Sequence, residues 1–184
     1  MDTNNSFPYI FKENIKELRE RERPISEYAV ETFNNIYDPK AGYNVKLEET
    51  PDLIKLWSIF DSILSSRFEN LEVLPNDRYK SYWTYVQNNE RYESKWHSHI
   101  KTASINAVYY PSIPDTTGTL SILTTSGVEA EVELNQGDLV IFPGWLIHKP
   151  NPQKHSRLPR VSINLELLTS TRPVFLCNNE KVLW

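Results

Sequence analysis

The sequence from Trp96 to Asn164 reads WHSHIKTASINAVYYPSIPDTTGTLSILTTSGVEAEVELNQGDLVIFPGWLIHKPNPQKHSRLPRVSIN. It consists of short apolar and β-branched runs separated by proline, glycine and asparagine. Runs of this length between turn residues are typical of β-strands. With similar runs on either side, they predict strands at residues 7–11, 79–86, 92–99, 104–110 (ended by Pro111), 120–123, 128–134, 138–142, 160–168 and 174–176.

The run from Val128 to Leu134 indicates how these strands would pack. Its apolar residues alternate with glutamates, so one face of the strand should be buried and the other exposed to solvent. Many short strands of this kind, preceded by helices, predict a mainly β fold. We expect a jelly-roll or related barrel with the N-terminal helices packed outside it.

The helices are expected in the first third of the chain. Thr50, Pro51 and Asp52 have the residue types of a helix N-cap, a first helical position and an acidic first turn. An apolar stripe follows from Leu53 to Phe68 and should pack against the sheet. Further helices are predicted at residues 14–23, ending where Pro24 interrupts them, and at residues 26–37.

Composition limits the class of protein. The chain has 184 residues and a net charge of −4, which suits a single domain over residues 1–184, helical over about 1–75 and barrel-forming over about 79–176. The charge favours neither nucleic acid nor an anionic membrane as a partner. One cysteine, Cys177, excludes an intrachain disulfide. Without a signal-peptide pattern we expect a cytoplasmic protein, or one in the host cytoplasm if a phage encodes it.

Three of the four histidines have the spacing of a metal site. His97 and His99 are two residues apart, so on a strand both side chains would point to the same side. His148 follows a Gly-Asp-apolar-Pro run that begins at residue 137. Because imidazole is a common ligand of divalent metals, these three residues predict a shared site. His155, between two prolines, is expected at the surface.

The strand predicted from Arg160 carries a second chemical signal. One face is apolar, whereas the other carries Arg160, Ser162, Asn164 and Glu166. A polar face inside a barrel is costly unless a ligand satisfies it. We expect Glu166 and Asp138 to face solvent, which would leave Arg160 to meet a diffusible anion.

At these residues the sequence resembles the iron(II)- and 2-oxoglutarate-dependent oxygenases, in particular the small prolyl-hydroxylase-like group found in phages and bacteria. The resemblance covers roughly residues 82–168. His97 and His99 match the family's His-x-Asp pair, and the run from Phe142 to His148 is similar to the signature that carries its distal histidine. The family has a double-stranded β-helix, which is therefore the barrel expected here.

The resemblance also implies roles for the site residues. His97, His99 and His148 would hold Fe(II), leaving positions for O2 and for the cosubstrate 2-oxoglutarate. Decarboxylation of 2-oxoglutarate to succinate would accompany hydroxylation of a substrate C–H bond. The distal carboxylate of 2-oxoglutarate would be bound by a group of polar residues, namely Arg160, Ser162, Tyr110 and Asn164.

One position departs from the family pattern. His99 stands where the family has a carboxylate ligand, and a third imidazole leaves the full charge of the ion uncompensated and also suits other divalent metals. Glu93 is a second candidate for a carboxylate ligand.

Two alternatives remain open. One is a cupin-type metal-dependent enzyme or binding protein that does not use 2-oxoglutarate, although the glutamate expected soon after a cupin's His-x-His pair is missing. The other is a non-catalytic barrel. The substrate of an oxygenase could be a peptidyl side chain, a small molecule or a nucleobase. The aromatic residues Trp83, Tyr85 and Trp145 would either line the mouth of the site or pack in the barrel.

Overall fold

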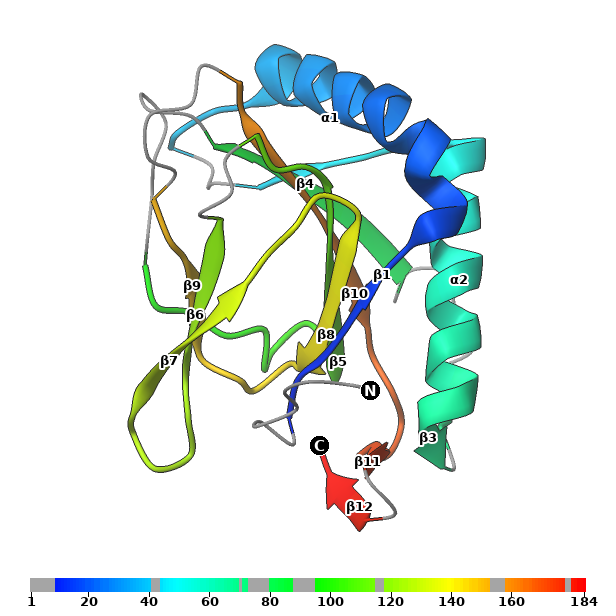
Figure 1. Cartoon of the computed structure of the whole chain (residues 1–184), viewed down its shortest axis with the longest axis vertical. Helices are drawn as coiled ribbons and strands as arrows, with labels where there is room; N and C mark the ends of the chain where they lie inside the picture. Colours follow the sequence, from blue (N-terminus) through cyan, green and yellow to red (C-terminus); the bar gives the residue numbers. More distant parts are fainter. Residues whose placement is uncertain are drawn as a thin grey trace.

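The larger barrel sheet has six antiparallel strands in the order β1-β8-β5-β10-β4-β2 (Figure 1). The computed structural model describes residues 9–40, 44–69, 71–72, 80–87, 95–114, 118–152, 158–177 and 180–184. In sheet order the strands are β1 Phe11–Asn14, β8 Asp138–Pro143, β5 Ile105–Ser112, β10 Arg160–Leu167, β4 Lys80–Gln87 and β2 Val45–Lys46.

A smaller sheet faces it and closes the barrel (Figure 1). Its order is β7-β6-β9, with β6 at Thr119–Leu123, β7 at Glu129–Glu133 and β9 at His148–Pro150. An isolated antiparallel bridge between His97 and His148 adds one more segment beside β9. A cluster of buried apolar side chains from both sheets fills the space between them, including Val108, Tyr110, Val140, Phe142, Leu120 and Ile122. This is the predicted mainly β, jelly-roll architecture.

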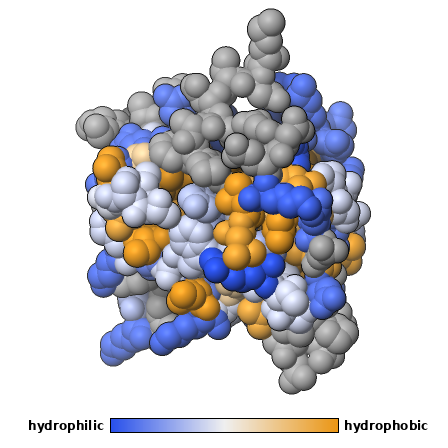
Figure 2. Space-filling view, turned by 90° about the horizontal axis from the view of Figure 1, so that it is seen from below, coloured by the Kyte–Doolittle hydropathy of each residue, from blue (hydrophilic) through white to orange (hydrophobic). Residues whose placement is uncertain are grey.

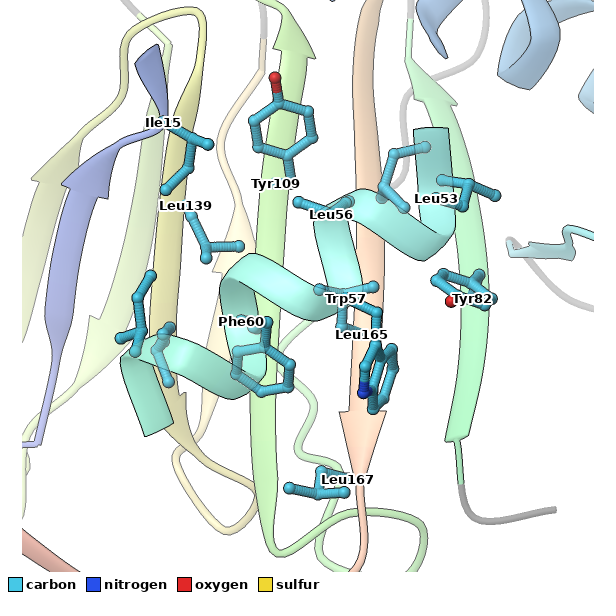
Figure 3. Packing of buried hydrophobic residues seen from close by; sticks show 14 of the residues in the cluster. Ile15, Leu53, Leu56, Trp57, Phe60, Tyr82, Tyr109, Leu139, Leu165 and Leu167 are labelled. Atoms are coloured by element: carbon cyan, nitrogen blue, oxygen red, sulfur yellow. The ribbon is translucent and has the colours of Figure 1, made fainter. Parts of the chain in front are cut away.

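Two helices cover the outer face of the large sheet, α1 at Glu22–Ile36 and α2 at Pro51–Arg67 (Figure 1). As predicted, Thr50 caps α2, and its hydroxyl oxygen accepts a hydrogen bond from the backbone N–H of Leu53 at 3.3 Å. The stripe of α2 packs on the strands (Figure 3), where it contributes Leu53, Leu56, Trp57 and Phe60 to a core shared with Tyr82, Tyr109, Leu139, Leu165 and Leu167. The helix thereby holds the back of the sheet rigid.

A third sheet, in the order β12-β11-β3, lies at the end of the molecule that carries the C-terminus (Figure 1). Its strands are β3 Phe68–Glu69, β11 Val174–Cys177 and β12 Glu180–Leu183. Phe68, Phe175 and Trp184 pack their rings together, with centroid separations of 4.7–5.2 Å. Only β11 of these strands was expected from the sequence, because β3 has two residues and β12 begins with two charged residues, Glu180 and Lys181.

The first helical segment differs from the prediction. Pro24 does not end a helix: a 3-10 helix, η1 at Lys16–Arg21, leads directly into α1, and Pro24 lies in the first turn of α1. The missing N–H of proline costs nothing there, because first-turn N–H groups have no partner within the helix. Of the opening strand predicted at residues 7–11, residues 7 and 8 lie outside the described residues, and β1 begins at Phe11.

Two strand predictions were also wrong in detail. β5 continues through Pro111 to Ser112, where its register with β10 shifts between Val161 and Ile163; such an irregularity tolerates a proline, which cannot donate to the ladder. Of the strand predicted at 92–99, residues 92–94 lie outside the described residues, and the rest forms only the bridge at His97.

The surface mixes polar and apolar side chains. Figure 2 shows one face, on which hydrophobic residues form several groups separated by hydrophilic ones. Within the described residues, no helix is both long and apolar enough to cross a membrane.

Candidate metal centre

Three imidazoles come together at one end of the barrel. His97, His99 and His148 each place a possible ligand nitrogen within 4.8 Å of the others. The His97 and His148 rings are the nearest pair, with centroids 4.3 Å apart. Their backbones exchange two hydrogen bonds, of 3.0 and 2.9 Å, so both side chains project to the same side of the bridge.

His99 reaches the cluster by a different route from the one expected. It does not lie on a regular strand: its carbonyl accepts hydrogen bonds from Thr102 and Ala103, which form a turn, and its own N–H donates to the carbonyl of Gly144 at 2.7 Å. A Cβ at Gly144 would lie 1.9 Å from the carbonyl oxygen of Ala103. Glycine therefore allows the segment before β9 to approach the turn that carries His99.

Each ring is held by a hydrogen bond at Nδ1. The Nδ1 atom of His97 lies 2.8 Å from the carbonyl oxygen of Lys95, and that of His148 lies 2.9 Å from the carbonyl oxygen of Leu146. A carbonyl oxygen can only accept, so these two Nδ1 atoms carry hydrogen. Nε2 of each neutral ring then keeps its lone pair for a metal ion.

Burial favours the neutral form of the His97 and His148 rings. Burial lowers the pKa of His148 well below its usual value, and the neighbouring His97 and His99 lower it further. The pKa of His97 is also lowered, mainly by desolvation, although the residue as a whole is exposed. A neutral imidazole is the form that binds metals, so both residues are ready to bind at neutral pH.

The cluster opens into a cavity of about 360 Å³. Besides His97 and His148, its walls include four other residues predicted for the site: Tyr110, Arg160, Ser162 and Asn164. The structure thus brings two of the three proposed metal ligands, His97 and His148, and the proposed anion-binding residues to one cavity, whereas His99 belongs to the histidine cluster but does not line the cavity. Its size exceeds that of a single small dicarboxylate, which leaves room for part of a substrate.

Arg160 is buried within the wall of this cavity, with 3% of its surface exposed. Its guanidinium donates to the side-chain oxygen of Gln87, to the carbonyl of Asn151 at 3.1 Å and to the carbonyl of Thr119 at 3.3 Å. These bonds fix the plane of the guanidinium between β10, β4 and the small sheet. The guanidinium therefore presents a fixed positive charge to the cavity, which suits an anion.

The neighbouring polar residues differ in how they are held. Burial raises the pKa of Tyr110 to about 12, an effect that nearby Arg160 partly opposes, so the phenol remains a hydrogen-bond donor at neutral pH. The hydroxyl of Ser162 donates to the carbonyl of Tyr85 at 3.3 Å.

Neither protein-family models nor curated proteins match the sequence. Among solved structures, a prolyl-4-hydroxylase from Pseudomonas putida matches with a TM-score of 0.62 and 14% identity, covering 89% of this chain and 95% of the other. AviO1 from Streptomyces viridochromogenes matches with a TM-score of 0.62 and 14% identity, covering 89% and 90%. SnoK, a non-heme α-ketoglutarate-dependent carbocyclase from nogalamycin biosynthesis, matches with a TM-score of 0.60 and 12% identity, covering 90% of this chain and 81% of the other. This chain has the prolyl-4-hydroxylase fold.

Within the prolyl-4-hydroxylase fold, two carboxylates lie elsewhere than predicted. Asp138 is not at the surface: with 3% exposure it accepts hydrogen bonds from the side chain of Asn14 and the backbone of Asn135. Glu166 does not face solvent either, because its Oε1 lies 2.7 Å from Nδ1 of His99. Both acids are buried because a polar partner from a distant segment satisfies them.

Sequence reasoning missed three residues of this polar interior. Gln87 contacts Arg160, Glu166 contacts His99, and Asn106 is fully buried opposite Glu166 in the β5–β10 register. Each of them is a polar residue on the barrel-facing side of a strand, and this position was the signal that could have found it. Gln87, for example, lies two positions after Tyr85 on β4 and therefore on the same face of that strand.

The remaining candidates have different outcomes. Of the three aromatic residues considered for the mouth, only Tyr85 lines the cavity. Trp83 donates to the hydroxyl of Ser81, and Trp145 packs edge-on against Tyr9. His155 and Glu93 lie outside the described residues.

Proposed function

We propose that the protein is an Fe(II)- and 2-oxoglutarate-dependent dioxygenase that hydroxylates a C–H bond. The observation that carries this proposal is the shared cavity, which is lined by Arg160 and by two members of the histidine cluster, His97 and His148. The prolyl-4-hydroxylase fold supports it as an analogy.

The donor set fits a divalent transition metal. Three neutral imidazoles grouped on one side leave further coordination positions toward the cavity, and iron(II) is among the metals that imidazole binds. When bound, Fe(II) supplies the redox chemistry that couples O2 and the decarboxylation of 2-oxoglutarate to substrate oxidation. His97, His99 and His148 are the proposed ligands.

The chain itself would bind and orient the cosubstrate. Arg160 receives the distal carboxylate of 2-oxoglutarate, and Tyr110 donates a further hydrogen bond to the same group. Ser162 and Asn164 line the path between that carboxylate and the metal. Apolar walls at Val108 and Leu120 exclude water, which strengthens the charge-assisted bonds.

The substrate is proposed at the level of class. A peptidyl side chain is the first candidate, because the fold is that of a prolyl-4-hydroxylase. A small molecule is the second, because a carbocyclase from nogalamycin biosynthesis has the same fold.

Metal binding tests the first half of the proposal. Purified protein should bind one Fe(II) or Co(II) per chain, measured by elemental analysis and by titration. His148→Ala should abolish binding because it removes a ligand from a buried cluster. His155→Ala is the matched control, since His155 is predicted to lie at the surface. Equal metal content in both variants would contradict the ligand assignment.

Binding of 2-oxoglutarate tests the second half. Under anaerobic conditions with Fe(II), 2-oxoglutarate should raise the melting temperature, because it binds only the folded state. Arg160→Ala should remove the shift while leaving metal content intact, whereas Arg23→Ala, at an exposed arginine on α1, should preserve it. Succinate should stabilise less because it lacks the keto group.

A cupin-type metal protein without 2-oxoglutarate is the second candidate. The donor set of three imidazoles, with no carboxylate among the clustered ligands, favours it. Metal binding together with no thermal shift from 2-oxoglutarate would replace the dioxygenase assignment with this one.

A further inference from the structure

Glu166 and His99 form a buried contact within the barrel. The Oε1 atom of Glu166 lies 2.7 Å from Nδ1 of His99, and the two side chains are 13% and 10% exposed. Glu166 lies on β10, two residues beyond Asn164, and therefore shares the barrel-facing side of that strand. The contact joins residues 67 positions apart in the sequence.

Glu166 does not belong to the group of clustered ligand atoms. The residues whose ligand atoms lie within 4.8 Å of one another are His97, His99 and His148. A carboxylate bound to one nitrogen of an imidazole leaves the other nitrogen for the metal, which is a common arrangement around histidine ligands. Glu166 thus contacts one nitrogen of the His99 ring, and it is not itself one of the clustered ligands.

The neighbours of Glu166 leave its charge available to His99. Its cross-strand partners are Asn106 on β5 and Ser81 on β4, both of which are neutral. Asn106 is fully buried, and neither atom of its amide has a hydrogen-bond partner. Neither cross-strand position therefore supplies a cation that would compete with the imidazole for the carboxylate.

We propose that Glu166 is a positioning residue of the metal centre, and this inference rests on the proposed metal-binding function. Its carboxylate fixes the tautomer of His99, directs Nε2 toward the ion and supplies negative charge through the ring. A dipositive ion held by three neutral ligands in a partly buried site has an uncompensated charge, which is costly. The chain thus keeps a carboxylate at the site, but this carboxylate contacts the ligand His99 and not the ion itself.

Two substitutions separate the charge from the hydrogen bond. Glu166→Gln keeps an oxygen that can accept from Nδ1 but removes the charge, and Glu166→Leu removes both. Competition titration of Co(II) against a chromophoric chelator should show about 10-fold to 100-fold weaker binding by Glu166→Gln than by wild type. Glu166→Leu should bind more weakly still. Glu13→Gln, at an exposed residue on the edge strand β1, is the charge-matched control and should bind like wild type.

A double substitution distinguishes a positioning role from a general structural one. His99→Asp alone would place two carboxylates close together, so the metal-free protein should melt at a lower temperature. His99→Asp combined with Glu166→Gln moves the charge to position 99 and should regain at least ten-fold in Co(II) affinity over Glu166→Gln alone. The visible spectrum of bound Co(II) should change with the loss of one nitrogen donor.

The outcomes separate the two proposals. If wild-type protein bound no Co(II) or Fe(II), both the proposed function and this inference would be overturned. If wild type bound metal and Glu166→Gln bound it equally well with an unchanged spectrum, only the role of Glu166 would be wrong. A loss of affinity matched by an equal loss of metal-free stability, without recovery in the double variant, would also overturn that role and indicate a structural contact.

Discussion

Gly144 is where the turn carrying His99 meets the segment that leads into β9. We expect Gly144→Ala to weaken Co(II) binding at least ten-fold and to lower the free energy of unfolding by about 1–3 kcal/mol, since the added Cβ meets backbone atoms that cannot move independently. Titration and chemical denaturation would measure the two effects.

Gly127→Ala is the matched control. Gly127 has a positive φ, 78°, unlike Gly144, and a Cβ there would meet nothing within 4 Å. This variant should lose stability through backbone strain alone and keep its metal affinity. Unchanged metal affinity in Gly144→Ala would show that the close approach does not position His99.

Gln87 offers a test of how Arg160 recognises an anion. Gln87 is 1% exposed, and its side-chain oxygen accepts a hydrogen bond from Arg160. Gln87→Glu would give Arg160 a permanent carboxylate of the same shape, so 2-oxoglutarate should bind at least ten-fold more weakly, with metal content unchanged. Calorimetric titration under anaerobic conditions would measure this affinity. Equal affinity in both proteins would mean that the cosubstrate does not bind at Arg160.

At the residue scale, the sequence predicted which polar residues gather at the site, but it did not predict every contact between them. The spacing of His97, His99 and His148 anticipated a cluster, because imidazole is a common metal ligand and two residues on one strand two positions apart point to the same side. The contact of Glu166 with His99 could not be seen, since the sequence does not show which buried carboxylate finds a partner. Glu166 was therefore wrongly expected in solvent.

Among the elements, α2 was predicted most completely. The start signal at Thr50 and the long apolar stripe both indicate a helix that begins at Pro51. A long periodic pattern predicts a helix reliably even where single residues are ambiguous. The segment around His97 was predicted poorly, because a single bridge has no period to detect. Pro24 and Pro111 misled the prediction because proline excludes only positions whose N–H is needed.

The cap of α2 provides a test that should leave the metal centre unaffected. Thr50→Ala removes the hydrogen bond to the N–H of Leu53 and should lower the free energy of unfolding by about 1 kcal/mol. Metal affinity should not change, because α2 packs on the outer face of the large sheet. A change in metal affinity, measured by titration, would show that the helix controls the geometry inside the barrel.

For the molecule as a whole, the buried histidines predict acid sensitivity. The pKa of His148 and that of His97 are lowered in the folded protein, so below about pH 6.5 the unfolded chain binds more protons than the folded one. Stability of the metal-free protein should therefore fall as the pH drops from about 6.5 toward the folded pKa values. Denaturation midpoints between pH 8 and pH 5 would measure this, and His148→Gln should reduce the dependence. A denaturation midpoint that did not fall with pH would contradict the lowered pKa values of these histidines in the folded protein.

The bridge between His97 and His148 also has a consequence for the order of folding. It joins segments about fifty residues apart, and its partner strand β9 is held in turn by β6. The entropic cost of closing this loop is met before contacts between distant segments form, so we expect the three imidazoles to meet after the two sheets have paired. We therefore expect that a metal ion does not nucleate this barrel as zinc nucleates a small finger domain. Metal uptake would instead report the final step of folding, and a chelator should empty the site without unfolding the chain.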